Sequence, residues 1–397
     1  MSTASTAGAA YRRTRVTWVA FGALFAFGIL NAALGPVLPY LRAAQGASYV
    51  AASLHPVAFA IGVVTAGIHA NRSTAPRKPI IIAGLGIAAL AGLLLGYGDL
   101  IAVTIAAAFL LGLFATVALI RTWAVLADAH NQHRATAMAE GEVYVSLAGI
   151  ATPILISLCA ATFLGWQSFF LIAAAMVTVA VTAVWLTRLP PVLPRDSDHI
   201  ATPEQSQPVR LSTRRTLITI IAIVGAEWTL TFWAATFLDE SVGIQQDTAV
   251  ALVSVLFAAS LLGRLLASRF ALRLPTLTVL HLALGCALVG APILLLAQNA
   301  VVATIGLSIA GIGIGATFPL ASSLHVGASR RSSDQSMGQV LIVAGLGQIA
   351  PLFTGALAQL VGLRAGLLVL PGFLLLAALT SRPRRHDARP AGEENHS

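Results

Sequence analysis

Twelve long apolar runs follow one another along this chain, and each is long enough to cross a lipid bilayer as a helix of about 20 residues. The chain of 397 residues is 57% hydrophobic and only 10% charged, whereas soluble domains carry about 25% charged residues. A backbone in lipid must satisfy its hydrogen bonds internally, and these continuous runs lack the alternation of barrel strands. We therefore expect an all-α membrane protein with twelve transmembrane helices. The expected spans lie near residues 16–38, 48–70, 79–97, 100–126, 136–160, 166–187, 216–238, 248–270, 276–297, 300–323, 336–360 and 363–380.

The basic residues are distributed very unequally between the two sides of these spans. Of the 24 Lys and Arg residues, only Arg42 and Arg364 fall in loops on one side, and Arg121 lies within a span. Because loops rich in Lys and Arg stay in the cytoplasm, we expect a multi-pass protein of the inner, or plasma, membrane with both termini cytoplasmic. The net charge of +9 is spread over short loops rather than gathered on one surface, which argues against a nucleic-acid partner.

One loop is much longer than the others. Residues 188–215 read RLPPVLPRDSDHIATPEQSQPVRLSTRR, and this content of proline, polar and charged residues predicts a flexible cytoplasmic linker. The linker separates an N-terminal six-helix bundle (1–187) from a C-terminal six-helix bundle with a short cytoplasmic tail (216–397). The two parts echo each other weakly, since span 5 opens with GEVYVSLAGIATP and span 11 with GQVLIVAGLGQIAP. Such repeats are typical of transporters whose halves move about a central site.

Several short stretches resemble the major facilitator superfamily of secondary transporters. They are LGPVLPYL at the end of span 1, GIHANRSTAPRK between spans 2 and 3, GRLLASRF after span 8 and GIGIGATFP in span 10. The resemblance covers nearly the whole chain. It implies two pseudo-symmetric six-helix bundles around a central cavity, lined by spans 1, 4, 7 and 10, that opens alternately to either side of the membrane. Two departures stand out, because Asn71 replaces the usual Asp of the loop motif and Thr152 replaces the Gly before Pro153 that drug antiporters often carry.

A single carboxylate lies in the middle of span 7. Glu227 is 12 residues from both Arg215 and Asp239, the nearest charged residues. An ionised carboxylate at bilayer depth costs a few kcal/mol, so it must face a partner or a water-filled cavity, or else be protonated. A carboxylate that alternates between the two forms can couple transport to protons, and we predict that role for Glu227. The alternative is a structural acid that is hydrogen-bonded to a neighbouring helix.

Further polar and aromatic residues in the spans are candidates to line the substrate cavity: Asn31, Arg121, Trp228, Thr231, Phe232, Trp233 and Gln348. Aromatic rings with a few hydroxyl groups suit a mostly apolar site, although the same rings could instead pack in the core or against lipid. Asn31 and Gln348 could form hydrogen bonds between helices. Arg121 could bind an anionic group, extend to the cytoplasmic surface, or pair with Glu140 or Glu142 at the start of span 5.

Four charged residues near the cytoplasmic ends of spans are predicted to form an inner gate: Arg72, Glu142, Arg264 and Arg269. The alternative for the arginines is that they only set the topology, and for Glu142 that it is simply solvated. The lone histidines in spans 2 and 9, His55 and His281, are interpreted as packing residues.

The sequence contains no Walker motif, no metal-ligand cluster and no Ser-His-Asp arrangement, and its GIGIG follows no strand. Cys159 and Cys286 fit no redox or metal spacing. We therefore predict a monomeric transporter rather than an enzyme, without a cofactor, whose partners are a small organic solute, protons and the lipid bilayer. Proton-coupled export of an amphipathic compound is favoured over import of a metabolite by symport. An uncoupled facilitator or a sensor of the same fold is the alternative.

Overall fold

The structure is a computed structural model that describes residues 11–72, 76–130, 133–190, 212–329 and 333–382. The described residues form helices and short connections, with no strand among them, so the fold is all-α as predicted. In chain order the helices are α1 (Arg15–Asn31), α2 (Leu38–Gln45), α3 (Tyr49–Arg72), α4 (Arg77–Tyr97), α5 (Ile101–His130), α6 (Arg134–Ala160), α7 (Ser168–Trp185), α8 (Thr213–Glu240), α9 (Gln246–Phe270), α10 (Thr276–Leu295), α11 (Ala300–Ala328), α12 (Ser333–Gly347), α13 (Ala350–Val361), α14 (Leu363–Gly366) and α15 (Val369–Thr380).

Eleven helical segments in the described part of the chain are long and apolar enough to cross a membrane, with α12 counted together with α13 and α14 with α15. The remaining apolar helix, α1, has 17 residues and continues through a turn into α2. Together these segments account for the twelve predicted spans. The predicted linker is shorter at its end than expected, because Thr213 already begins α8; residues 191–211 lie outside the described residues.

Prolines interrupt the hydrogen bonding of several spans, because each lacks the N–H that would bind the carbonyl four residues earlier. In α3, Pro56 leaves the carbonyl oxygen of Ala52 in need of a donor, and Nδ1 of His55 donates to it at 3.0 Å. The other ring nitrogen, Nε2, lies 2.9 Å from Thr104 Oγ1 on α5. His55 is thus a buried packing residue, as predicted, and it also supplies the hydrogen-bond donor that Pro56 cannot provide to the Ala52 carbonyl.

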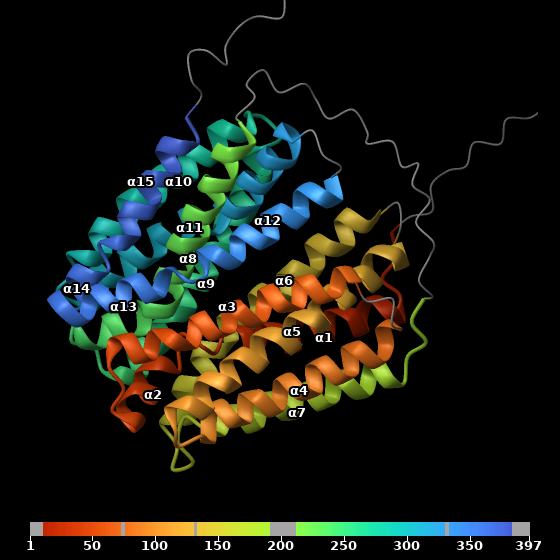
Figure 1. Cartoon of the computed structure of the whole chain (residues 1–397), viewed down its shortest axis with the longest axis horizontal. Helices are drawn as coiled ribbons and strands as arrows, with labels where there is room; N and C mark the ends of the chain where they lie inside the picture. The colour runs from red at the N-terminus through yellow and green to blue at the C-terminus, as the bar shows by residue number, and fades with distance from the viewer. Residues whose placement is uncertain (1–10, 73–75, 131–132, 191–211, 330–332, 383–397) are drawn as a thin grey trace, which may run out of the picture.

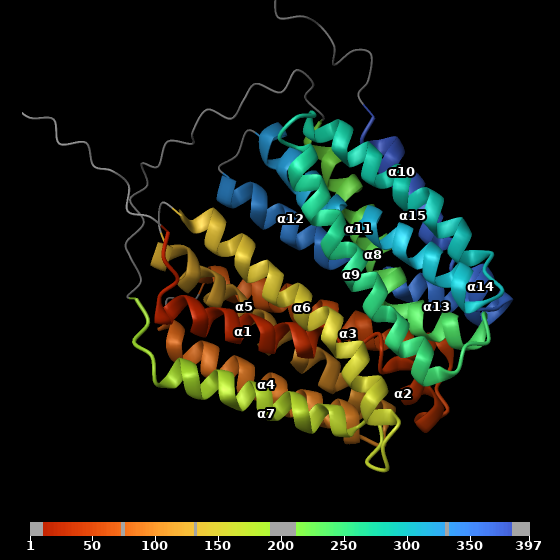
Figure 2. The same ribbon diagram turned by 180° about the vertical axis from the view of Figure 1, so that it is seen from behind.

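The helices form two groups that lie side by side. Figures 1 and 2 show α1–α7, coloured red to yellow-green, as one group and α8–α15, green to blue, as the other; we call them the first half and the second half. The halves meet where α6 packs on α9 and where α3 packs on α12 and α13. We call the end that holds Tyr11 and Arg382 the tail end, and the opposite end, with α2 and α14, the far end (Figure 1).

Polar contacts tie the halves together at the far end. Arg42 on α2 forms an ion pair with Glu240 at the end of α8, and the hydroxyl of Tyr49 donates a hydrogen bond to the same carboxylate. The hydroxyl of Tyr40 donates to Asp247 on α9 at 2.6 Å. We call these five residues the far-end cluster.

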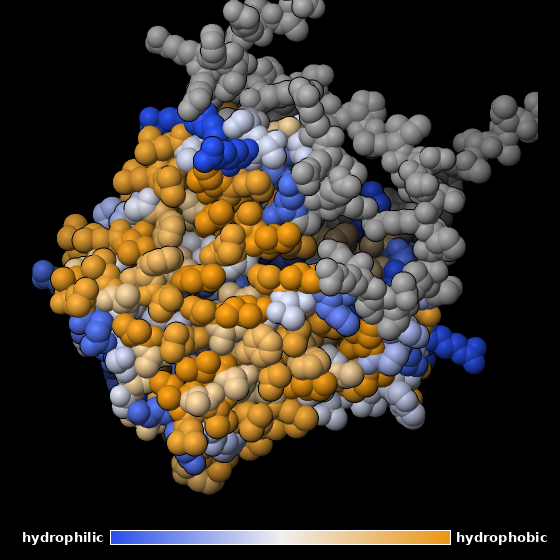
Figure 3. Space-filling model, in the orientation of Figure 1, coloured by the Kyte–Doolittle hydropathy of each residue, from blue (hydrophilic) through white to orange (hydrophobic). Residues whose placement is uncertain are grey.

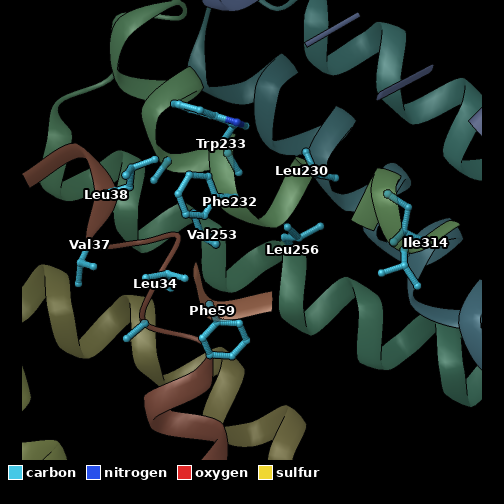
Figure 4. Close-up of a cluster of buried hydrophobic side chains, with 14 of the residues drawn as sticks. Leu34, Val37, Leu38, Phe59, Leu230, Phe232, Trp233, Val253, Leu256 and Ile314 are labelled. Carbon is cyan, nitrogen blue, oxygen red and sulfur yellow. The ribbon is translucent and has the colours of Figure 1, made fainter. Parts of the chain in front are cut away.

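An apolar core shared by the two halves lies beneath the far-end cluster. Figure 4 shows Leu34, Leu38 and Phe59 of the first half in one group of buried side chains with Phe232 and Val253 of the second half. Residues 32–41, before and within α2, and residues 232–238 of α8 are all buried. The far end of the molecule is therefore closed.

Side chains of the central helix α1 become more exposed toward the tail end of the molecule. Residues 26–30 of α1 are buried, but Trp18 is 50% exposed and Gly22 is also exposed. α1 packs against α4, α5, α6 and α7 of its own half, and the exposed Trp18 meets the ring of Tyr144 on α6 edge-on. The central helices are thus buried at the far end and partly exposed toward the tail end.

The outer surface matches a lipid environment. Figure 3 shows apolar side chains, in orange, over the middle of the face in view, with hydrophilic ones, in blue, gathered toward its ends. Large exposed apolar residues occur on many spans, including Leu90, Leu158, Val179 and Leu360. A water-soluble monomer does not expose apolar surface of this extent, so lipid is the medium that this surface fits.

Candidate functional site

Glu227 lies near the middle of α8, between buried residues 222–226 and 229–230. Its side chain keeps 26% exposure although the helix around it is packed. Because the residues nearer the far end are buried, we expect water or a solute to reach the exposed part of this side chain from the tail end.

Arg264, on α9, is the cation that the structure brings to Glu227. Its Nη2 lies 4.0 Å from Glu227 Oε1, and its Nη1 lies 3.4 Å from Glu142 Oε2. Its Nε donates a hydrogen bond of 3.1 Å to the carbonyl oxygen of Gly315 on α11. That carbonyl lacks its usual helical donor because Pro319 has no N–H, and the arginine supplies the missing one. One guanidinium therefore connects two carboxylates and the backbone of α11.

The backbones of α9 and α11 touch beside this arginine. A Cβ atom on Gly263 would lie 2.0 Å from the carbonyl oxygen of Ile312, which is far inside any allowed contact. Only glycine permits this approach, and the approach places Arg264 within reach of the Gly315 carbonyl.

Glu142 belongs to α6 of the first half, so its pair with Arg264 crosses between the halves. The side chain of Glu142 is 53% exposed and that of Arg264 is 36% exposed. Two residues earlier on α6, Glu140 pairs within its own half, with Arg13 at 2.6 Å and with the hydroxyl of Tyr11 at 2.7 Å. Burial and this hydrogen bond raise the pKa of Tyr11 to about 12. The two glutamates of α6 thus serve different contacts.

Trp228 and Thr231 share the partly exposed part of α8 with Glu227. The ring of Trp228 lies 5.5 Å from the ring of Phe59 on α3 of the first half. Thr231 lies one turn after Glu227, and its backbone packs closely on Gly35. A Cβ atom on Gly35 would lie 2.4 Å from the carbonyl oxygen of Thr231. A carboxylate, an indole and a hydroxyl therefore lie together just below the closed far end.

Phe232 and Trp233, two further cavity candidates, lie inside the closed region instead. Their exposures are 2% and 0%. The indole N–H of Trp233 donates to the carbonyl oxygen of Pro351 at 3.0 Å, and its ring meets that of Tyr49 at 5.8 Å. Both residues therefore pack in the buried core at the far end, and their side chains are not exposed to a solute in this state.

The remaining cavity candidates lie at separate positions. Asn31 is the last residue of α1, and Gln348 lies in the break between α12 and α13; both are partly buried. Arg121 is partly buried on α5. The glutamates proposed as its partners have other contacts, because Glu140 pairs with Arg13 and Glu142 with Arg264.

The predicted gate residues are only partly brought together. Glu142 and Arg264 form a pair, whereas Arg269 is exposed on α9. Arg72 ends α3, and its side chain lies outside the described residues. At the same end of the first half, Arg77 pairs with Asp128 at 2.7 Å.

The sequence does not predict the far-end contacts, although it holds a sign of them. Arg42 and Arg364 are the two arginines assigned to the outer loops, against the general charge bias. Arg42 pairs with Glu240, and Arg364 donates to the backbone carbonyls of Ser241 at 2.6 Å and Ala297 at 3.0 Å. Both exceptions to the bias are therefore used to join elements at the far end.

A matched pair of hydrogen bonds at the tail end also escapes sequence reasoning. Thr17 on α1 lies 2.7 Å from His130 on α5, and Thr216 on α8 lies 2.7 Å from His325 on α11. The first and fourth spans of each half are thus joined by a contact between a threonine and a histidine, through Nε2 of His130 in the first half and Nδ1 of His325 in the second. Among the described residues, no group of three or more His, Cys, Asp or Glu could hold a metal ion.

Comparisons with known proteins agree on the fold. The family model described as the Major Facilitator Superfamily matches residues 20–350. A bacterial homologue of the human lysosomal transporter Spinster, in an inward-facing and unoccupied conformation, superposes with a TM-score of 0.76 at 16% identity, over 94% of this chain and 97% of its own. The nucleoside transporter NupG gives 0.75 at 13% identity, over 93% and 99%. A D-xylose-proton symporter gives 0.69 at 13% identity, over 92% and 96%. No curated protein matches the chain by sequence.

Proposed function

The chain belongs to the Major Facilitator Superfamily, and on that premise we propose that it is a proton-coupled secondary transporter that moves a small organic solute across the cell membrane by alternating access. The observation that carries the proposal is the position of Glu227. It is a carboxylate in the middle of a central span, on a side chain that keeps 26% exposure, with a cation 4.0 Å away. Ionisable groups at such depth are retained at a cost and mark ion or substrate pathways.

In the proposed cycle the tail end is cytoplasmic, as the distribution of Lys and Arg predicts. Glu227 then exchanges its proton with the cytoplasm in the state described above, in which the far end is closed. After the far-end cluster separates and the tail end closes, the same carboxylate faces the opposite side. Protonation at one side and release at the other would couple the proton gradient to movement of the solute.

The surroundings of Glu227 favour a solute with an apolar or aromatic part. Trp228 offers a partly exposed indole ring that is backed by Phe59, Thr231 offers a hydroxyl, and the neighbouring residues of α8 are apolar. Few precisely placed polar groups in apolar walls are typical of small-molecule sites. Export of an amphipathic compound suits this lining. Import by symport is the second candidate, since the D-xylose-proton symporter shares the fold.

The proposal is tested by measuring protons and solute together. Compounds that raise the unfolding temperature of the purified protein are selected first, because a ligand of the folded state stabilises it. Each is then added to proteoliposomes that contain a trapped pH-sensitive dye, with and without an uncoupler. We expect a solute-evoked pH change for the unaltered protein and for Glu140→Gln, whose acid pairs within the first half, and none for Glu227→Gln.

A solute-evoked pH change that persists in Glu227→Gln would remove Glu227 from the coupling step. An uncoupled facilitator is the competing function, and the contact of Glu227 with Arg264 is the observation that favours it, since a paired acid can be purely structural. That function predicts solute movement without any pH change, at the same rate in the presence of the uncoupler.

A further inference from the structure

Two carboxylates from opposite halves share one guanidinium. Glu142 on α6 and Glu227 on α8 both face Arg264, at 3.4 and 4.0 Å. We propose that Arg264 is a positioning residue that carries the protonation state of Glu227 to the first half of the molecule. When Glu227 is ionised, Arg264 binds it and leaves Glu142; when Glu227 is protonated, Arg264 binds Glu142. This inference rests on the proposed function of Glu227.

The geometry is that of competition between the two acids. A full charge-assisted hydrogen bond between a guanidinium and a carboxylate is about 2.7–2.9 Å long. Both contacts of Arg264 are longer than this, so the guanidinium lies between the acids and is fully bound to neither. Its Nε is held by the Gly315 carbonyl at 3.1 Å, which leaves the two terminal nitrogens to serve the two acids. A rotation that shortens one contact lengthens the other.

Few other charges can disturb this balance. Besides α9, the elements packed against α8 are α2, α11, α12, α13, α14 and α15. Residues 300–328, 339–361 and 369–380 of these elements contain no Asp, Glu, Lys or Arg, and their only titratable group is His325, which contacts Thr216 at the tail end. Arg42 and Arg364, on α2 and α14, are engaged at the far end. α12 also carries Asp334 in its first turn. Among the described side chains, the acids that the structure brings to Arg264 are Glu227 and Glu142.

The pair of Glu142 and Arg264 is well placed to act between the halves. It lies on the contact of α6 with α9, toward the tail end. Further along the same contact, Gly149 of α6 lies against the ring of Phe257 on α9, with 3.1 Å between the position of a Cβ and the ring. Tight packing at Phe257 and an ionic contact nearer the tail end allow the helices to pivot. Proton uptake by Glu227 should then strengthen the ionic contact and narrow the tail end.

The test follows the tail-end distance as a function of pH. Spin labels are placed at Leu186→Cys and Leu272→Cys, which are exposed residues at the tail ends of the two halves, after Cys159 and Cys286 are replaced by Ala. The full chain is purified, and distance distributions are recorded from about pH 5 to about pH 9, a range that brackets carboxylates with shifted titration. In the starting protein the shorter distance should gain population as the pH falls.

Glu142→Gln is the decisive variant. It removes the carboxylate that Arg264 binds when Glu227 is protonated, but it leaves Glu227 and the contact of Arg264 with the Gly315 carbonyl in place. We expect the pH response of the distance to be lost, or its midpoint to move by about one pH unit or more. Glu140→Gln, on the same helix but paired within the first half, should titrate like the starting protein. Arg264→Lys keeps a charge without the forked geometry and should show a smaller response than Arg264 itself.

The two proposals fail in different ways. If Glu142→Gln titrates like the starting protein while Glu227→Gln has lost both its pH response and its solute-evoked pH change, the relay through Arg264 is wrong and the proposed function stands. If Glu227→Gln keeps both responses, the proposed function itself is wrong. Equal unfolding temperatures of Glu142→Gln and Glu140→Gln would exclude a folding defect as the cause of a difference between them.

Discussion

Glu227 is tolerated within α8 because the neighbouring helix supplies a guanidinium and because part of the carboxylate remains accessible. The same guanidinium donates a hydrogen bond to the Gly315 carbonyl of α11, which Pro319 leaves without its helical donor. At the scale of the residue, one side chain, Arg264, therefore contacts both the proposed proton-coupling acid and the free carbonyl of α11. We therefore expect replacement of Arg264 to lower the stability of the protein and, if the proposed function holds, to impair transport.

Replacing Arg264 by Met should lower the free energy of unfolding by about 1–3 kcal/mol, because the Gly315 carbonyl loses its donor and Glu227 loses its cation. The double variant Arg264→Met/Glu227→Gln should recover part of the loss, since a neutral amide needs no cation. Thermal unfolding in detergent, followed with a dye that reacts with the buried Cys159, measures both. A double variant less stable than Arg264→Met alone would contradict the pairing.

The sequence predicts Glu227 because a lone charge in an apolar run is visible without a structure. It also selects Glu142 and Arg264, but as parts of a gate and not as partners of Glu227. The contact of Arg264 with the Gly315 carbonyl is not predictable in this way, since it depends on how α9 and α11 cross. For Phe232 and Trp233, the sequence shows aromatic rings beside Glu227 but not the burial that the far end imposes on them.

At the scale of the helix, the contact between α9 and α11 depends on glycine. Gly263→Ala would bring a Cβ to 2.0 Å from the Ile312 carbonyl oxygen, which is a backbone atom and cannot move aside. We expect a loss of about 1–3 kcal/mol in stability from this overpacking. Gly285→Ala is the matched control, because it is exposed on α10 with no atom within 4 Å of the added Cβ.

The control should be neutral or more stable by up to about 1 kcal/mol, as alanine is the better helix former. The unfolding temperatures of the two variants are compared with that of the starting protein, and a lower temperature for Gly263→Ala alone is the result expected from the contact of α9 with α11. Equal stability of Gly263→Ala and Gly285→Ala would mean that the two backbones are not in contact.

Helix positions are predicted well because the length and apolarity of a span are local properties of the sequence. The breaks are not. The predicted first span ends in the turn at residues 32–37, and span 11 is divided at residues 348–349 between α12 and α13. Neither break is visible as an interruption of apolar character, since Gly35 and Pro351 lie within apolar stretches. The breaks arise where the halves approach each other, and that approach is a property of the whole fold.

At the scale of the whole molecule, the far-end cluster holds the described state closed. Glu240→Gln should weaken the contacts with Arg42 and Tyr49 and shift the population toward opening at the far end. Ser53 is buried on α3 against Gly355 of α13, so a cysteine placed there reports on that opening.

The rate at which a maleimide labels Ser53→Cys should rise about 3- to 10-fold in Glu240→Gln, as expected for the loss of one ion pair of modest strength. Asp99→Asn is the control, since Asp99 is exposed in a far-end loop of the first half. An unchanged rate in Glu240→Gln would show that the apolar core alone keeps the far end closed.

The weak repeat between spans 5 and 11 predicts two related halves, and the matched contacts of Thr17 with His130 and of Thr216 with His325 extend that relation to three dimensions. Which end is closed has no counterpart in the sequence. It depends on contacts between residues about 200 positions apart, such as Arg42 and Glu240, and such pairs cannot be identified from hydropathy or spacing.

Proton coupling by the proposed mechanism requires that Glu227 takes up and releases a proton. Infrared difference spectra of the purified protein, recorded between about pH 5 and about pH 9, detect the carbonyl stretch of a protonated carboxylic acid directly. Proton uptake by Glu227 predicts a band that is present in the starting protein and in Glu140→Gln and is missing from Glu227→Gln. If the spectrum of Glu227→Gln contains the same band with the same pH dependence, Glu227 does not titrate and the coupling mechanism is contradicted.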